Sequence, residues 1–123
     1  MKTRRLGKTD LQVSEIGFGG EWLERHPEEE SIELIHYASS KGINILDCWM
    51  ADPKSRDIIG KGIKDNRSQW FIQGHIGSTW KNEQYFRTRD MKYVRPAFED
   101  LLKRLQTDYI DLGMIHYVDS EEE

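Results

Sequence analysis

The sequence predicts an α/β fold with parallel strands, and three observations support this prediction. Strand-like and helix-like stretches alternate along most of the 123 residues. Before the first of these units, residues 7–10 (Gly-Lys-Thr-Asp) form a turn-rich tetrapeptide between two short strand-like stretches. The length suits one compact domain, and apolar and charged shares of 37% and 33% are typical of a globular chain.

A hairpin, a strand and a helix are expected first along the chain. Residues 4–6 and 12–14 form the predicted hairpin, and residues 15–20 form a short strand that runs into glycines. Pro27 and the three glutamates after it open a helix, because proline fits the first turn and carboxylates favour its positive end. Gly42 ends this helix.

Three more strands, with a helix before each of the last two, are expected after Gly42. The strands cover residues 43–49, 70–77 and 109–116. Ser55 can cap the first of these two helices. The second and longest helix covers residues 88–105, with apolar residues at helical spacing. Pro96 lies inside it, so its first turn is expected to be kinked or separate.

Four parallel strands are too few to close a barrel, so both ends of the predicted sheet are expected to be edges. This leaves three arrangements: an open sheet, pairing with another protomer, or part of a longer polypeptide. The chain is interpreted as one partial domain over residues 1–123. Its parts are the hairpin region 1–15, the β/α units 16–119 and an acidic tail 120–123.

Composition excludes several classes of function. The net charge of −4 and the lack of a Lys/Arg stripe argue against binding to nucleic acid. No apolar run approaches the roughly 20 residues that cross a bilayer, so no membrane partner is expected. The single cysteine, Cys48, excludes an internal disulfide and a cysteine-ligated cluster built from this chain alone. We therefore expect a cytoplasmic protein.

Five segments resemble the aldo-keto reductase superfamily, in the family's own order and over nearly the whole chain. They are residues 5–19 (RLGKTDLQVSEIGFG), 42–47 (GINILD), 59–64 (IGKGIK), 102–112 (LKRLQTDYIDL) and 115–116 (IH). The resemblance implies a (β/α)8 barrel of the TIM type, of which this chain holds the first half: the hairpin, four parallel strands and three helices. It also implies an oxidoreductase that transfers hydride from NADPH to a carbonyl, once the barrel is complete.

The resemblance further implies a set of site residues. Family members use a tyrosine acid, a lysine, an aspartate and a histidine, of which Asp47 and His116 match in place. Asp52 stands where the tyrosine is expected, and His75 stands where the lysine is expected. Gly19 and Gly20, together with Asp47, match positions beside the cofactor. Two of the four catalytic positions are therefore replaced.

Residues 73–80 (QGHIGSTW) resemble a divergent branch of the superfamily whose larger members add a ferredoxin-like, cysteine-rich C-terminal region. This resemblance implies a flavin- or iron–sulfur-linked redox role. The ligands of such a group would be supplied outside this chain.

Other interpretations of the same residues stay open. His75 and Asp52 could form a substitute acid/base pair, since imidazole titrates near neutral pH. Asp47, His75 and His116 could bind zinc or non-haem iron in a metal-dependent enzyme. Asp47 could instead cap a strand end, and His116 could be a core histidine. The chain could also be a catalytically inactive half-barrel that self-associates through its sheet edges. A small-molecule substrate is a further possible partner.

Overall fold

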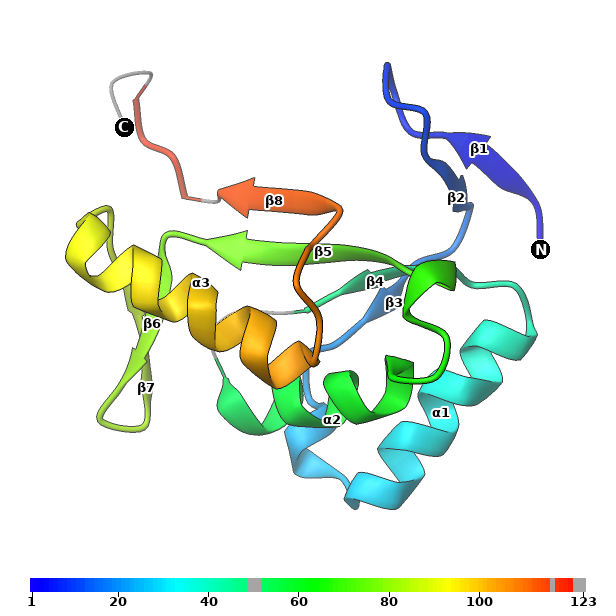
Figure 1. Cartoon of the computed structure of the whole chain (residues 1–123), viewed down its shortest axis with the longest axis horizontal. Helices are drawn as coiled ribbons and strands as arrows, with labels where there is room; N and C mark the ends of the chain where they lie inside the picture. Colours follow the sequence, from blue (N-terminus) through cyan, green and yellow to red (C-terminus); the bar gives the residue numbers. More distant parts are fainter. Residues whose placement is uncertain (49–51, 116, 121–123) are drawn as a thin grey trace.

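A computed structural model describes residues 1–48, 52–115 and 117–120 (Figure 1). The strands are β1 (Thr3–Arg5), β2 (Gln12–Ser14), β3 (Phe18–Gly19), β4 (Ile45–Asp47), β5 (Phe71–Ile76), β6 (Ser78–Lys81), β7 (Gln84–Arg87) and β8 (Leu112–Ile115). The helices are α1 (Glu28–Ser40), α2 (Pro53–Ile63) and α3 (Met91–Leu105), with short 3-10 helices η1 (Leu23–Arg25) and η2 (Arg67–Gln69). Every predicted strand and helix is present.

The central sheet has four strands in the order β3-β4-β5-β8, and every neighbouring pair is parallel. The predicted parallel arrangement is therefore confirmed. The three helices lie together on one face of this sheet (Figure 1). Strands β3 and β8 are the two edges within the described part of the chain, as expected for half of a barrel.

The hairpin of β1 and β2 is antiparallel, as predicted, and Asn44 connects it to the sheet. The backbone N–H of Ser14 donates to Asn44 Oδ1 at 2.7 Å, and Asn44 Nδ2 donates to the Gln12 carbonyl at 2.9 Å. Because Asn44 immediately precedes β4, these bonds hold the hairpin at the N-terminal end of the parallel strands.

The core lies between the sheet and the helix layer. Its buried members are Leu23, Ile35, Ala38, Leu46, Cys48, Ile58, Ile59, Ile63, Trp70, Ile72, Leu101 and Leu105. Close approach of α2 and α3 depends on Gly60, where a Cβ atom would overlap the carbonyl oxygen of Arg104. Isoleucines and leucines fill the space around this contact, so burial of apolar surface holds the layers together.

Arg67 fixes strand β8 beside β5 at the N-terminal end of the sheet. Its guanidinium donates to the Asp111 carboxylate at 2.9 Å and to the carbonyls of Trp70 and Tyr109 at 2.7 and 2.9 Å. Asp111 in turn accepts the backbone N–H of Ile72 at 2.8 Å. Both charged side chains are mostly buried, so this pair specifies the register of the sheet edge.

One local prediction was wrong, a second was contradicted in part, and one element was not predicted. Asp52 caps α2, not Ser55: its carboxylate accepts the Ser55 N–H at 2.8 Å, and Pro53 occupies the first turn. The first turn of α3 is not separate, because the helix runs continuously through Pro96. Residues 78–87 form the antiparallel hairpin β6–β7 between β5 and α3, which the sequence patterns did not reveal.

Candidate functional site

The candidate site lies at the C-terminal ends of β4 and β5. Asp47 is the last residue of β4 and pairs in register with Gln73 of β5, and His75 lies two residues further along β5. Alternate residues of a strand share one face, so the three side chains project from the same side of the sheet. Leu46 and Ile72 point the other way, into the core under the helices.

Hydrogen bonds connect these three side chains. His75 Nε2 lies 2.7 Å from Asp47 Oδ1, and Gln73 Nε2 donates to the same oxygen at 2.9 Å. The imidazole is only 5% exposed, whereas the carboxylate is 32% exposed. An ionised carboxylate only accepts hydrogen bonds, so His75 Nε2 carries the proton in this pair. We call Asp47, Gln73 and His75 the rim cluster.

The rim cluster can hold and move a proton. A carboxylate bound to one ring nitrogen fixes the orientation of the imidazole. Such a pair suits acid/base chemistry on a group that approaches from the barrel interior. The structure thus brings Asp47 and His75, both singled out in the sequence, together at one end of the sheet.

The two predicted cofactor-binding glycines differ in their surroundings. A Cβ at Gly19 would meet no atom within 4 Å, so this strand end faces open space next to Asp47, with which it pairs. A Cβ at Gly20 would overlap the Asp47 carbonyl oxygen, which accepts the Gly20 N–H at 2.8 Å. Gly20 is therefore required for close packing of β3 against β4, and Gly19 borders open space.

The remaining predicted site residues are placed differently. The Asp52 carboxylate caps α2, and the described contacts pair His75 with Asp47 instead of Asp52. His116 lies outside the described residues. Within the described ranges, no three His, Cys, Asp or Glu side chains gather closely enough to bind a metal. The metal interpretation therefore depends on His116 and stays a prediction.

Cys48 follows Asp47 but takes no part in acid/base chemistry. The thiol is fully buried, and burial raises its pKa to about 12. Its backbone N–H donates to the Gln73 carbonyl at 2.9 Å, which extends the pairing of β4 with β5 by one residue. Cys48 is thus a small apolar core residue.

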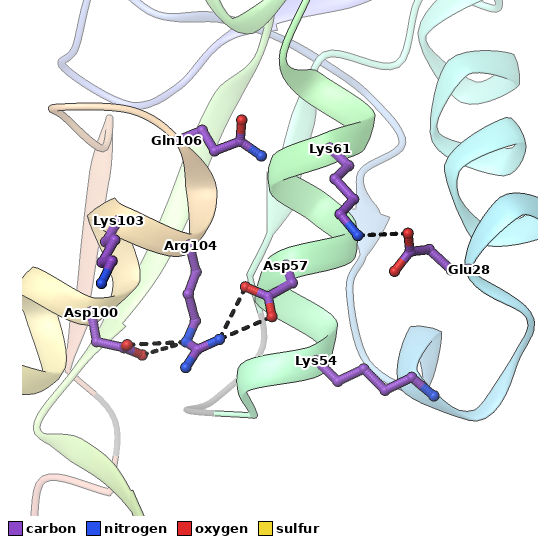
Figure 2. A pocket seen from close by; sticks show the side chains of 8 residues that line it. All are labelled: Glu28, Lys54, Asp57, Lys61, Asp100, Lys103, Arg104 and Gln106. Carbon is purple, nitrogen blue, oxygen red and sulfur yellow. Dashed lines mark hydrogen bonds and ion pairs between the residues drawn. The ribbon is translucent and has the colours of Figure 1, made fainter.

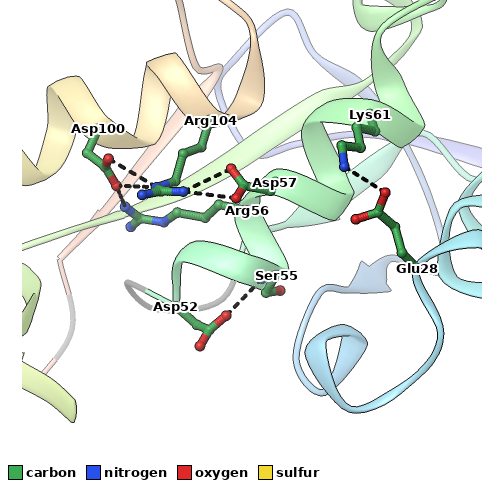
Figure 3. Close-up of polar contacts among 8 residues, drawn as sticks. All are labelled: Glu28, Asp52, Ser55, Arg56, Asp57, Lys61, Asp100 and Arg104. Atoms are coloured by element: carbon green, nitrogen blue, oxygen red, sulfur yellow. Dashed lines mark hydrogen bonds and ion pairs between the residues drawn. The ribbon is translucent and has the colours of Figure 1, made fainter. Parts of the chain in front are cut away.

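A second polar region lies between α2 and α3, in a groove on the helix layer (Figure 2). Arg104 donates to both oxygens of Asp57 at 2.9–3.0 Å and to both oxygens of Asp100 at 2.8–3.0 Å. Figure 3 shows the buried Arg56 reaching the same Asp100, with 4.0 Å between the charged atoms. We call Asp57, Arg104 and Asp100 the helix network; its hydrogen bonds join α2 to α3.

The hairpin, the four parallel strands and the helix layer form half of a (β/α)8-type barrel, and comparison with known proteins identifies the family. The family model "Aldo/keto reductase family" matches residues 15–123, so the chain belongs to this family. The resemblance inferred from the sequence is confirmed.

Individual relatives agree with this assignment. Aldo-keto reductase YhdN of Bacillus subtilis is 35% identical over 97% of this chain and 39% of its own length. The holo form of an aldo-keto reductase from Bacillus halodurans superposes with a TM-score of 0.82 at 32% identity, covering 94% of this chain and 40% of that one. An aldo-keto reductase from Klebsiella pneumoniae in complex with NADPH shares the fold, with a TM-score of 0.75 at 21% identity over 97% and 40% of the two chains.

The chain thus spans about 40% of the length of these relatives. The fold is of the (β/α)8 type, and the described part contains its first four parallel strands and three helices. The predicted flavin- or iron–sulfur-linked redox role gains no support from these three relatives. Among the described residues, no helix is both long and apolar enough to span a bilayer.

Gln73 is the site residue that sequence reasoning missed. Its signal was its position two residues before His75 on a strand, which places both side chains on one face. The resemblance gave no reason to single it out, because the family's set holds no residue at that position.

Proposed function

We propose that this chain forms part of an NADP(H)-dependent oxidoreductase in which His75, oriented by Asp47, handles the proton of carbonyl reduction. The family assignment supports an oxidoreductase, and the replacement of the family's tyrosine and lysine calls for a different proton donor. His75 occupies the position of that lysine.

One observation carries the proposal: the 2.7 Å hydrogen bond between the buried His75 imidazole and Asp47 at the ends of adjacent parallel strands. In barrel enzymes of this type, active sites form at the C-terminal ends of the strands. A histidine held in place by a carboxylate is a common proton donor in enzyme active sites.

The open space at Gly19, beside Asp47, leaves room for a nicotinamide cofactor. When bound, NADPH would supply the hydride that turns a carbonyl carbon into an alcohol carbon. The carbonyl oxygen must then gain one proton. His75 donates this proton and becomes neutral, while the Asp47 carboxylate keeps the imidazole in its orientation.

The proposed activity needs a complete barrel. Cofactor binding and turnover are therefore assigned to an assembly in which the edges β3 and β8 are covered. Either the remainder of a longer chain or another copy of this chain would supply that cover, and the substrate would be a small carbonyl compound.

The test is NADPH-dependent reduction of a panel of small aldehydes and ketones by the complete polypeptide that carries this sequence. We expect turnover that falls about 100-fold or more in His75→Gln, as for loss of a general acid. His36→Gln is the matched control, because His36 is exposed on α1, far along the chain from the rim cluster. Binding of NADPH, followed by its fluorescence, should be retained in both variants.

Two results would contradict the proposal. The first is reduction that proceeds at an unchanged rate in His75→Gln. The second is absence of both NADPH binding and turnover in the native complete polypeptide.

A further inference from the structure

We infer that Gln73 is a positioning residue. It holds the Asp47 carboxylate in the orientation in which Oδ1 accepts the hydrogen bond from His75 Nε2. The inference concerns a residue that the family's catalytic set does not contain. The expected effect of Gln73 on catalysis rests on the proposed function. Its effect on the contact between His75 and Asp47 can be tested without any activity.

The location of Gln73 on the middle strand allows this role. In register, Gln73 pairs with Asp47 of β4 on one side and with Leu112 of β8 on the other. Its side chain shares the inner face of the sheet with His75, two residues further along β5. The Gln73 amide therefore lies beside the contact between His75 and Asp47.

The contacts of the amide define its orientation. Nε2 donates to Asp47 Oδ1 at 2.9 Å and lies 3.6 Å from the sulfur of Met114 on β8. A carboxylate oxygen and a thioether sulfur are both acceptors, so the group between them must be the NH2 end of the amide. The amide thus connects the two strands that flank β5.

The shared acceptor explains how Gln73 would act on His75. Asp47 Oδ1 accepts hydrogen bonds from both Gln73 Nε2 and His75 Nε2, at 2.9 and 2.7 Å. Rotation of the carboxylate away from the amide would therefore also move its oxygen away from the imidazole. Since Asp47 is about one-third exposed, water competes for this oxygen, and a second donor from the protein restricts the motion.

The test compares Gln73→Met with the native chain, because methionine has a similar length but lacks the donor. In the 15N-labelled chain at low temperature, we expect the His75 Nε2–H to exchange with water about tenfold faster in the variant. In the complete polypeptide, kcat should fall about tenfold with KM unchanged. Met114→Leu is the matched control: it removes the sulfur, keeps the bond between Gln73 and Asp47, and should stay within about twofold of native in both measurements.

The outcomes separate this inference from the proposed function. Faster exchange in Gln73→Met supports positioning even if the native polypeptide reduces no carbonyl, a result that would overturn only the proposed function. Exchange and kcat within about twofold of native would overturn the inference. If Gln73→Met fails to fold by circular dichroism, Gln73→Asn replaces it, because the shorter amide cannot keep the same reach and should give the same acceleration.

Discussion

The rim cluster and the helix network use the same chemistry in different surroundings. In both, a carboxylate accepts two or more hydrogen bonds at 2.7–3.0 Å. His75 in the rim cluster is 5% exposed, whereas Arg104 in the helix network is 31% exposed, and its partners Asp57 and Asp100 are 43% and 41% exposed. The hydrogen bonds of the two regions are therefore similar in length but differ in how far water can reach them.

Burial and location explain this difference. Ion pairs near the surface contribute about 0–1 kcal/mol each, because water and salt screen them. In contrast, a buried imidazole bound to one carboxylate keeps one orientation and one protonated nitrogen, which is what proton transfer requires. The helix network serves the packing of α2 on α3, whereas the rim cluster is the place where we propose proton transfer.

The largest expected effect on stability comes from Gly60→Ala, in the helix layer. A Cβ there would overlap the Arg104 carbonyl and come within 3.0 Å of the Leu105 Cα, so α2 and α3 must separate. We expect a loss of about 3 kcal/mol in the free energy of unfolding, measured with urea, despite the better helix propensity of alanine. Gly19→Ala is the control and should cost far less, since its Cβ meets open space; equal losses would refute the packing argument.

A smaller loss of stability is expected for substitutions of Asp52. These variants also show whether Asp52 serves as a helix cap or as an acid/base group. Asp52→Ala removes the cap of α2 and should cost about 1 kcal/mol of stability, while Asp52→Ser keeps a capping oxygen and should cost much less. Thermal unfolding measures both. If Asp52 acted as an acid/base group, as the sequence left open, both variants would lose activity equally; we expect activity to follow the cap instead.

The smallest effect is expected for Asp57→Ala in the helix network. Arg104 keeps its bonds to Asp100, so we expect a loss of about 0.5 kcal/mol at low salt. The loss should shrink further in 1 M salt (a roughly 3 Å screening length). Urea titrations at the two salt concentrations provide the measurement, and a loss above about 2 kcal/mol that salt does not change would mean that the network is effectively buried.

The fold could be predicted from the sequence because its signals are periodic. Apolar runs separated by helical patterns define the parallel units, and the hairpin over residues 3–14 has clear turn residues. The hairpin β6–β7 lacks such a signal: its turn uses Asn82 and Glu83, both with positive φ, where Asn-Gly would be the recognisable pair. Its strands also carry few aliphatic residues, so no alternating pattern marks them.

The site could be predicted only in part, for two physical reasons. Asp47 and His75 were identified through the resemblance to the aldo-keto reductase superfamily, whereas the register that pairs Gln73 with Asp47 is a three-dimensional property. The cap of α2 was ambiguous because Asp52 and Ser55 are both good capping residues. Pro53 could have decided between them, since proline favours the first position after a cap.

The contact between His75 and Asp47 is most directly tested by the 15N resonances of the His75 ring in the labelled chain. The structure requires the neutral ring to carry its proton on Nε2, because Nε2 lies 2.7 Å from a carboxylate oxygen that can only accept. We predict the Nε2–H tautomer in the native chain and loss of that preference in Asp47→Asn. A native His75 protonated on Nδ1, with resonances unaffected by Asp47→Asn, would contradict the proposed role of His75.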